Sequence, residues 1–120
     1  MLEKKWFVFL LMGLLFIGCG PDTIFVRPGL DTPSQHVANG HQLLEQGKFD
    51  AACREFDRAK ELDPSYIRAY VGLGVTLGKK GDIDAGMQLM EKAKNMAGST
   101  QDFEIVRQGY EQLAAIKRLK

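Results

Sequence analysis

The sequence predicts an all-α fold of amphipathic helices that pack together, and three observations predict it. The first is a helical stripe in residues 47–64, where the apolar side chains are spaced three and four residues apart. The second is a copy of this pattern that begins at Gly81, as the first begins at Gly47. The third is a last amphipathic stretch over residues 101–119 that lacks the repeated pattern. Since one such helix cannot bury its stripe alone, we expect these stretches to pack against one another.

The two copies match position by position. Gly40, Leu43, Gly47, Phe49, Ala52, Phe56, Ala59 and Leu62 recur as Gly74, Leu77, Gly81, Ile83, Gly86, Met90, Ala93 and Met96. This constant period, with small and large residues at these offsets, resembles the tetratricopeptide repeat (TPR), an antiparallel helix pair. The resemblance implies a TPR-like domain over residues 32–120, with repeats at about 31–64 and 65–98 and a capping helix at about 101–119. The chain departs from the family signature at His36, Asn39 and Gly98, where the family often has an aromatic residue, leucine and proline.

Residues 1–18 have the form of a secretion signal. Lys4 and Lys5 provide the positive end, and an apolar run broken only by Gly13 extends from Trp6 to Ile17. That run is too short to cross a hydrocarbon core of about 30 Å, which takes roughly 20 helical residues, and it suits the apolar region of a cleaved signal. The segment Leu15-Phe16-Ile17-Gly18-Cys19 resembles the bacterial lipobox, with phenylalanine in place of the usual leucine. The alternative is an uncleaved anchor with an unrelated cysteine.

The lipobox resemblance implies that Cys19 is lipidated, with palmitate among its acyl chains, and becomes the mature N-terminus. Each buried methylene contributes about 0.8 kcal/mol, so two or three acyl chains hold a protein on a membrane without a spanning helix. Gly20 follows the cysteine, whereas in enteric-type sorting an aspartate there retains lipoproteins at the inner membrane. We therefore expect a lipoprotein of the cell envelope, on the outer membrane and facing the periplasm. Residues 19–31, which contain Pro21, Pro28 and Gly29, are expected to form a flexible tether.

The first two helices of the TPR-like domain have local start and stop signals. Asp31-Thr32-Pro33 offers capping side chains and a proline in the first turn, so the first helix should run to about Gln46. Gly47 separates it from the second helix, and Pro64 stops that second helix from running on.

The remaining helices carry similar signals. Asp63-Pro64-Ser65 should begin the third helix, whose interior holds three glycines, Gly72, Gly74 and Gly78, that each cost up to about 1 kcal/mol relative to alanine. Close helix contact accounts for Gly74, and no feature of the sequence accounts for the other two. Asp82 should cap the fourth helix, Ile83 to Met96, and Gly98-Ser99-Thr100 should cap the fifth, from Gln101 to about Leu119.

Charge and motif content argue against nucleic-acid binding and against an enzyme. The formal net charge is +1, and removing Met1 to Gly18 takes away two lysines and one glutamate, which leaves a neutral chain without the basic surplus that nucleic acid requires. His36 and His41 are five residues apart and do not share a helix face as a metal-ligand pair would. Cys53 fits a small buried hydrophobe. We expect no catalytic residues, cofactor or metal.

The TPR resemblance also implies a binding surface, because the first helix of each pair in that family lines a concave groove for a peptide or a partner helix. The positions carried over are Val37, His41, Leu44, Arg68, Val71, Val75 and Lys79, with Ser34, Glu45 and Gly78 beside them. An apolar groove edged by Arg68 and Lys79 suits an amphipathic or extended apolar segment. The alternative is that Val71 and Val75 are simply core residues.

The sequence therefore predicts a non-catalytic protein–protein interaction adaptor, held at a membrane by lipidated Cys19, that binds a peptide or helix of another envelope protein. The carboxylate-clamp branch of the family is disfavoured, because Ala38, His41, Gly72 and Val75 occupy the clamp positions. The alternative function is a self-associating structural subunit of an envelope assembly, since solenoids generally need about three units to be stable. That alternative makes the protein a homo-oligomer.

Overall fold

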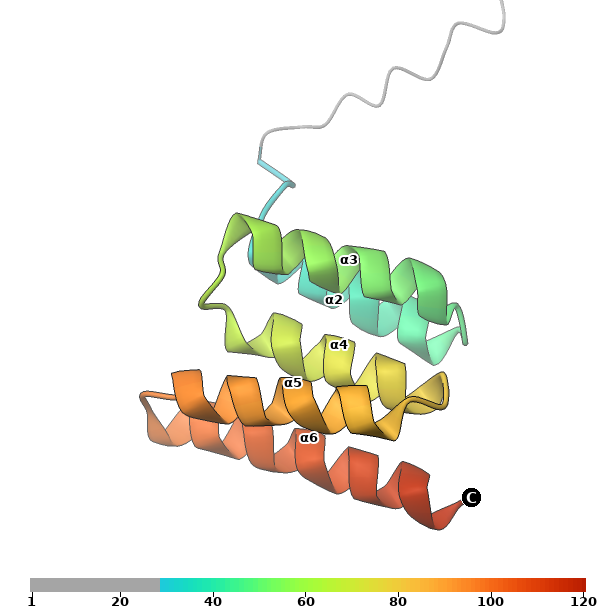
Figure 1. Ribbon diagram of the computed structural model, residues 1–120. Coiled ribbons are helices and arrows are strands. Elements are labelled where there is room, and N and C mark those ends of the chain that lie inside the picture. The colour runs from blue at the N-terminus through green and yellow to red at the C-terminus, as the bar shows by residue number, and fades with distance from the viewer. Residues whose placement is uncertain (1–28) are drawn as a thin grey trace, which may run out of the picture.

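The computed structural model describes residues 29–120, which form five α-helices (Figure 1). They are α2 (Pro33–Glu45), α3 (Phe49–Leu62), α4 (Ile67–Lys79), α5 (Ile83–Met96) and α6 (Thr100–Arg118). This part of the chain contains no strand, so the all-α prediction is confirmed. The predicted signal peptide, Cys19 and most of the predicted tether lie outside the described residues. None of the five helices has the length and apolar character needed to cross a bilayer.

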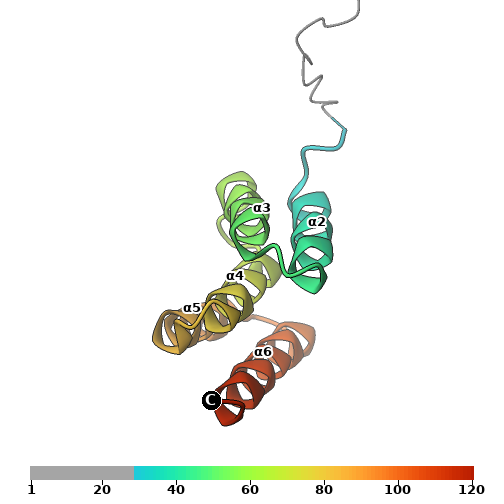
Figure 2. The same ribbon diagram turned by 90° about the vertical axis from the view of Figure 1, so that its right-hand side faces the viewer.

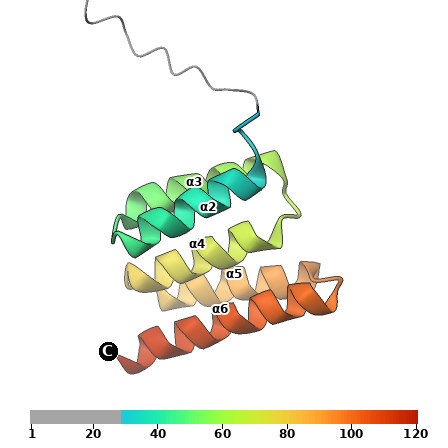
Figure 3. The same cartoon turned by 180° about the vertical axis from the view of Figure 1, so that it is seen from behind.

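The helices form two hairpins and a capping helix. Helix α2 packs on α3, α4 packs on α5, α3 joins the hairpins by packing on α4, and α6 packs on both α4 and α5. Viewed along the helices, α3 and α5 lie on one side, α2 and α6 on the other, and α4 between them (Figure 2). Figure 3 shows the side formed by α2, α4 and α6, which run in the same direction. This is the short α-solenoid that the sequence period predicts.

Three helix starts follow from local capping. The side chains of Thr32, Asp82 and Ser99 each accept a hydrogen bond from the backbone N–H three residues on, at 3.2, 3.0 and 3.1 Å respectively. Such bonds satisfy amide groups that the first helical turn leaves without partners. The predicted starts of α2, α5 and α6 are confirmed to within a residue.

The start of α4 differs from the sequence prediction. Asp63 Oδ1 accepts hydrogen bonds from the Ser65 backbone N–H at 3.0 Å and from Ser65 Oγ at 2.8 Å, and Tyr66 N–H donates to the Asp63 carbonyl at 3.0 Å. The Asp63 side chain thereby closes a separate turn instead of capping the helix, which begins only at Ile67.

The two hairpin turns depend on glycine. Gly47 has φ +73° and Gly81 has φ +108°, within the left-handed region that side chains disfavour. Each lies just after the end of the first helix of its hairpin, and the two glycines are equivalent positions of the two repeats. The turn geometry therefore repeats with the same period as the helices.

The core is built by large side chains that enter gaps left by glycines. Phe56 on α3 is fully buried and sits against Gly40 of α2 and Gly72 of α4, where an added Cβ would overlap its ring. The ring therefore lies between both helices of the first hairpin and α4. It also supplies the reason for Gly72, since a larger residue would displace Phe56.

The second repeat uses the same construction. Met90 on α5 lies against Gly74 of α4 and Gly109 of α6, and an added Cβ would come within 2.9 Å of its Cε at each glycine. Leu113 of α6 is fully buried and approaches Gly78 so closely that an alanine there would overlap it. The glycines of α4 are thus points of contact with three neighbouring helices.

Candidate functional site

The seven side chains predicted to line a partner-binding groove divide into a buried and an exposed group. The apolar ones, Val37, Leu44, Val71 and Val75, are buried, and the polar ones, His41, Arg68 and Lys79, are exposed. Only 8% of Val71 and 2% of Val75 is accessible to solvent. This contradicts the expectation of an exposed apolar surface centred on these valines. It supports the alternative that both belong to the core.

Helix α6 is the physical reason why Val71 is covered. A Cβ placed on Gly109 would lie 2.8 Å from Val71 Cγ1, so the backbone of α6 packs directly on α4 at this point. The sequence predicts a capping helix, but the place where it docks is not part of the repeat signature. Gly109, inside an otherwise amphipathic helix, is the signal in the sequence that could have found this contact.

His41 connects the core of the first hairpin to its exposed side. Its ring centroid lies 5.2 Å from that of Phe56, with the two planes at 76°, an edge-to-face contact. Burial lowers the pKa of His41, Glu45 acts in the opposite direction, and Arg68 lowers it further. The imidazole is therefore neutral at pH 7, and it offers a partner a hydrogen bond without a charge.

Arg68 lies at the N-terminal end of α4, beside a cavity of about 330 Å³ between α4 and the start of α6. The walls include the apolar side chains of Met96 and Ile105 and the carboxylate of Asp102. Hydrogen bonds from Ser99 and Gly98 lower the pKa of Asp102, and Arg68 adds a smaller effect in the same direction. The cavity combines one cation, one anion and an apolar wall.

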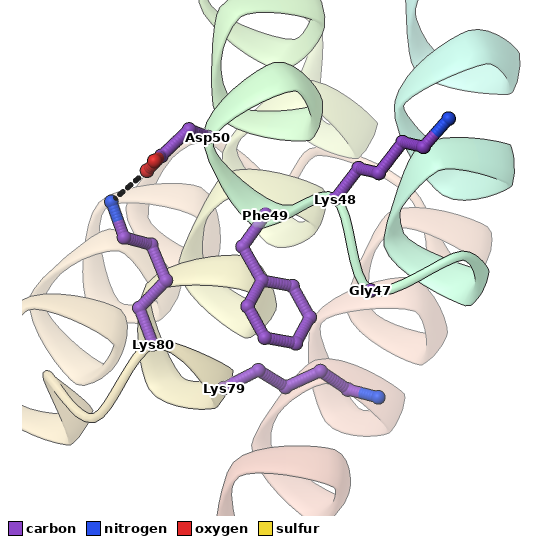
Figure 4. Close-up of a pocket in the computed structure, with 6 residues that line it drawn as sticks. All are labelled: Gly47, Lys48, Phe49, Asp50, Lys79 and Lys80. Carbon is purple, nitrogen blue, oxygen red and sulfur yellow. Dashed lines mark hydrogen bonds and ion pairs between the residues drawn. The ribbon is translucent and has the colours of Figure 1, made fainter.

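Lys79 lies at the opposite end of α4, beside a cavity of about 460 Å³ (Figure 4). The lining residues are Gly47, Lys48, Phe49, Asp50, Lys79 and Lys80. Lys80 Nζ donates a hydrogen bond to Asp50 Oδ1 at 2.5 Å, which lowers the pKa of Asp50 and raises that of Lys80. Lys48 and Lys79 form no ion pair with any residue in 29–120. The Lys79 side chain runs alongside the Phe49 ring, whereas the Lys48 side chain points away from the ring (Figure 4).

Arg68 and Lys79 thus mark the two ends of one helix face. They are separated by about three turns, which places them on the same side of α4 and about 16 Å from each other along its axis. We call the exposed side chains of His41, Glu45, Arg68 and Lys79 the α2–α4 face. The structure brings these residues to one side of the molecule but does not gather them in a single cavity.

A second group of charged residues, which we call the N-terminal polar cluster, joins α2 to α3. It consists of Asp31, His36, Glu55 and Arg58. His36 contacts Asp31 Oδ1 through Nε2 and Glu55 Oε2 through Nδ1, each at 2.7 Å, and Arg58 Nη2 lies 2.6 Å from Asp31 Oδ2. Since both ring nitrogens face carboxylate oxygens, both are donors and the ring is an imidazolium.

The pKa shifts of the N-terminal polar cluster agree with this protonation. Burial lowers the pKa of His36, but the hydrogen bonds to Asp31 and Glu55 outweigh it and the net shift is upward. Hydrogen bonds from Arg58 and then His36 lower the pKa of Asp31 to about 2. Among residues 29–120, no group of three or more His, Cys, Asp or Glu side chains is arranged to hold a metal ion. The cluster is a network of ion pairs that fastens α2 to α3.

Two protein-family models match the helical hairpins. A TPR repeat model matches residues 40–81, and a tetratricopeptide repeat model matches residues 67–100. The chain is a TPR-containing protein. Its repeats support a role in protein–protein interaction, and the TPR resemblance implies binding along the first helix of each pair, α2 and α4.

This TPR protein is also similar to a curated relative, the tetratricopeptide repeat and J domain-containing co-chaperone DNJ1 from Cryptococcus neoformans var. grubii. The two are 32% identical over 66 residues, which are 55% of this chain and 12% of the relative. No solved structure gives a significant match. The likeness to the co-chaperone is therefore confined to a small part of that protein.

Proposed function

We propose that this TPR protein is a non-catalytic adaptor that holds another cell-envelope protein at a membrane. The observation that carries the proposal is the α2–α4 face, where His41, Arg68 and Lys79 are exposed above buried valines. Because those valines are covered, the exposed polar groups are left to make the contacts with a partner. The adaptor therefore selects its partner by charge and hydrogen bonding.

The spacing of the cations indicates what kind of segment fits. The distance of about 16 Å along α4 between Arg68 and Lys79 equals about five residues of extended chain. Because alternate side chains of an extended chain point to opposite faces, acidic side chains four or six residues apart are the ones that can reach both cations. Lys48 also lines the cavity at the Lys79 end and adds to the positive charge of that region.

The binding surface is tested with a charge-reversed variant in an affinity pull-down from detergent-solubilised envelopes. Arg68→Glu combined with Lys79→Glu should lose the principal partner, because both charges that attract it are inverted. Arg54→Glu is the matched control, since Arg54 is an exposed cation on α3, outside the α2–α4 face. Recovery of the same partner by the double variant, with unchanged helicity, contradicts the proposal.

The membrane attachment is a second part of the proposal, and it rests on the lipobox resemblance. Lipidated Cys19 anchors the adaptor in the outer membrane, facing the periplasm, at the end of the tether. Wild-type protein should incorporate radiolabelled palmitate, whereas Cys19→Ala should accumulate as unprocessed precursor. Normal cleavage of the alanine variant, together with no label in the wild type, excludes the anchor.

A further inference from the structure

An apolar groove runs between α5 and α6 and is covered by no element of residues 29–120. Two cavities, of about 510 and about 310 Å³, share the side chain of Tyr110 and together form what we call the α5–α6 groove. The larger cavity is bounded by Met87, Ala114 and Lys117. The smaller lies at Phe103, beside Arg107 and Glu111.

The exposure of this groove sets α6 apart from the equivalent helices. Helix α2 is paired with α3 and α4 with α5, whereas α6 packs on α4 and α5 and has no later helix beside it in the described part of the chain. As a result 52% of Phe103 and 42% of Met87 is exposed. Large apolar side chains gathered along a groove are a mark of an interaction surface.

The groove has an exposed ring at one end and its larger cavity at the other. A large side chain, Phe103, protrudes at one end, and the larger cavity lies at the other end near Lys117. Tyr110 is in the middle, seven residues after Phe103 and seven before Lys117. A two-fold axis at Tyr110 turns one end of the groove onto the other, so each copy places Phe103 in the larger cavity of its partner. Such an isologous contact closes on itself and forms a dimer.

Charged side chains of both signs border the groove at each end. The Phe103 end carries three carboxylates, Glu91, Glu104 and Glu111, which share two cations, Lys94 and Arg107. The surplus at this end is one negative charge.

The other end carries one cation and one anion and is neutral as a whole. Lys117 and Asp84 line the larger cavity, and neither forms an ion pair within residues 29–120. The two-fold arrangement brings Lys117 of each copy to the glutamates at the Phe103 end of its partner. It also brings Asp84 toward Lys94 and Arg107 of the partner.

We infer that the α5–α6 groove binds the α5–α6 groove of a second copy, which produces a two-fold dimer with antiparallel α6 helices. The inference goes beyond the proposed adaptor function, because it uses none of the residues of the α2–α4 face. The dimer carries two α2–α4 faces. Two linked faces bind a partner that displays two acidic segments more tightly than one face does.

Sedimentation equilibrium of the full chain in density-matched detergent tests the dimer. Wild-type protein should sediment as a dimer, and Phe103→Glu should raise the dissociation constant at least about tenfold because it brings a charge to an apolar cavity. Leu119→Glu is the matched control, since Leu119 is an apolar residue near the end of α6 that is 89% exposed and lines neither cavity. A wild type that stays monomeric up to about 100 µM overturns the inference. So does a Phe103→Glu variant that dimerises as the wild type does.

Cysteine cross-linking tests the two-fold axis separately. A cysteine at position 110 lies on the axis and meets its own copy, so Tyr110→Cys should give a disulfide-linked dimer well above the wild-type background from Cys53. Gln112→Cys is the control, because Gln112 is exposed about 200° further round α6. Absence of a cross-link in Tyr110→Cys, or equal cross-linking in both variants, overturns the proposed arrangement. Cross-linking confined to Tyr110→Cys supports it.

Discussion

The two ends of the solenoid differ in the side chains that they expose: charged side chains in ion pairs at one end and apolar side chains at the other. At the N-terminal end, α2 and α3 are joined by the N-terminal polar cluster, in which each charged group has a partner. At the C-terminal end, α5 and α6 leave an apolar groove with Phe103 and Met87 exposed. A surface of paired charges is stable in water. By contrast, the free energy falls when another surface covers an apolar groove. The comparison favours self-association at the C-terminal end, apart from the α2–α4 face proposed to bind the partner.

Between these ends the interior repeats itself. Phe56 and Met90 occupy equivalent positions of the two repeats, both are fully buried, and each rests on glycines of two neighbouring helices. The repeated interior sets the fold, and the ends and exposed faces set what the fold binds. Substitutions in the two kinds of region should therefore have different effects.

The largest expected effect belongs to the interior. Phe56→Ala should lower the free energy of unfolding by about 3–5 kcal/mol, because it removes a fully buried ring and leaves a cavity between three helices. Phe103→Ala, at the exposed end, should change it by less than about 0.5 kcal/mol in the monomer. Urea unfolding at low protein concentration measures both. A loss below about 1 kcal/mol for Phe56→Ala contradicts the distinction.

A smaller effect is expected where a methyl group is added to the interior. Gly72→Ala places a Cβ inside the Phe56 ring position, so it should cost about 1–3 kcal/mol as the ring and α4 move apart. Gly98→Ala is the matched control, since nothing lies within 4 Å of a Cβ added there. If the two variants unfold at the same urea concentration, Phe56 does not depend on close contact with α4.

The smallest effect is expected at the N-terminal polar cluster, and it depends on pH. The pKa of His36 is raised in the folded state, so its contribution to stability is complete below the ordinary value of 6.5 and is lost as pH rises through the raised pKa. The pKa of Asp31 is lowered from 3.8 to about 2, so its contribution is present above 3.8 and is lost as pH falls toward 2.

The His36 contribution is measured as a difference between two proteins. From about pH 5 to about pH 9, the wild type should lose its stability advantage over His36→Gln, because only the wild type has the imidazolium to lose. Both proteins keep His41, whose pKa is shifted the opposite way, so that effect cancels. A stability difference that does not change with pH shows that His36 carries no charge in the cluster.

The sequence predicted those features that depend on neighbouring residues or on the repeat. The caps at Thr32, Asp82 and Ser99 form within four residues, and the equivalence of Phe56 and Met90 follows from the repeat period. Asp63 misled the prediction of the α4 start, because an aspartate before a helix can close a turn as well as cap it.

Features that depend on distant parts of the chain could not be predicted in the same way. Gly72 has its reason in Phe56 of the preceding hairpin, and Gly78 has its reason in Leu113 of the capping helix. The predicted binding residues Val71 and Val75 proved to be buried, and at Val71 the covering residue is Gly109 of α6. The sequence pattern of an apolar helix residue is the same whether a partner protein or another helix of the same chain covers that residue.

Amide hydrogen exchange of the full chain in detergent, at a low and a high protein concentration, tests most directly whether the C-terminal end is the open one. Exchange in α6 should slow as the concentration rises, because the second copy covers the α5–α6 groove. Exchange in α2 should stay the same, because the N-terminal polar cluster needs no further partner. Exchange in α6 that is independent of concentration, or equal slowing in α2, would contradict the difference between the two ends.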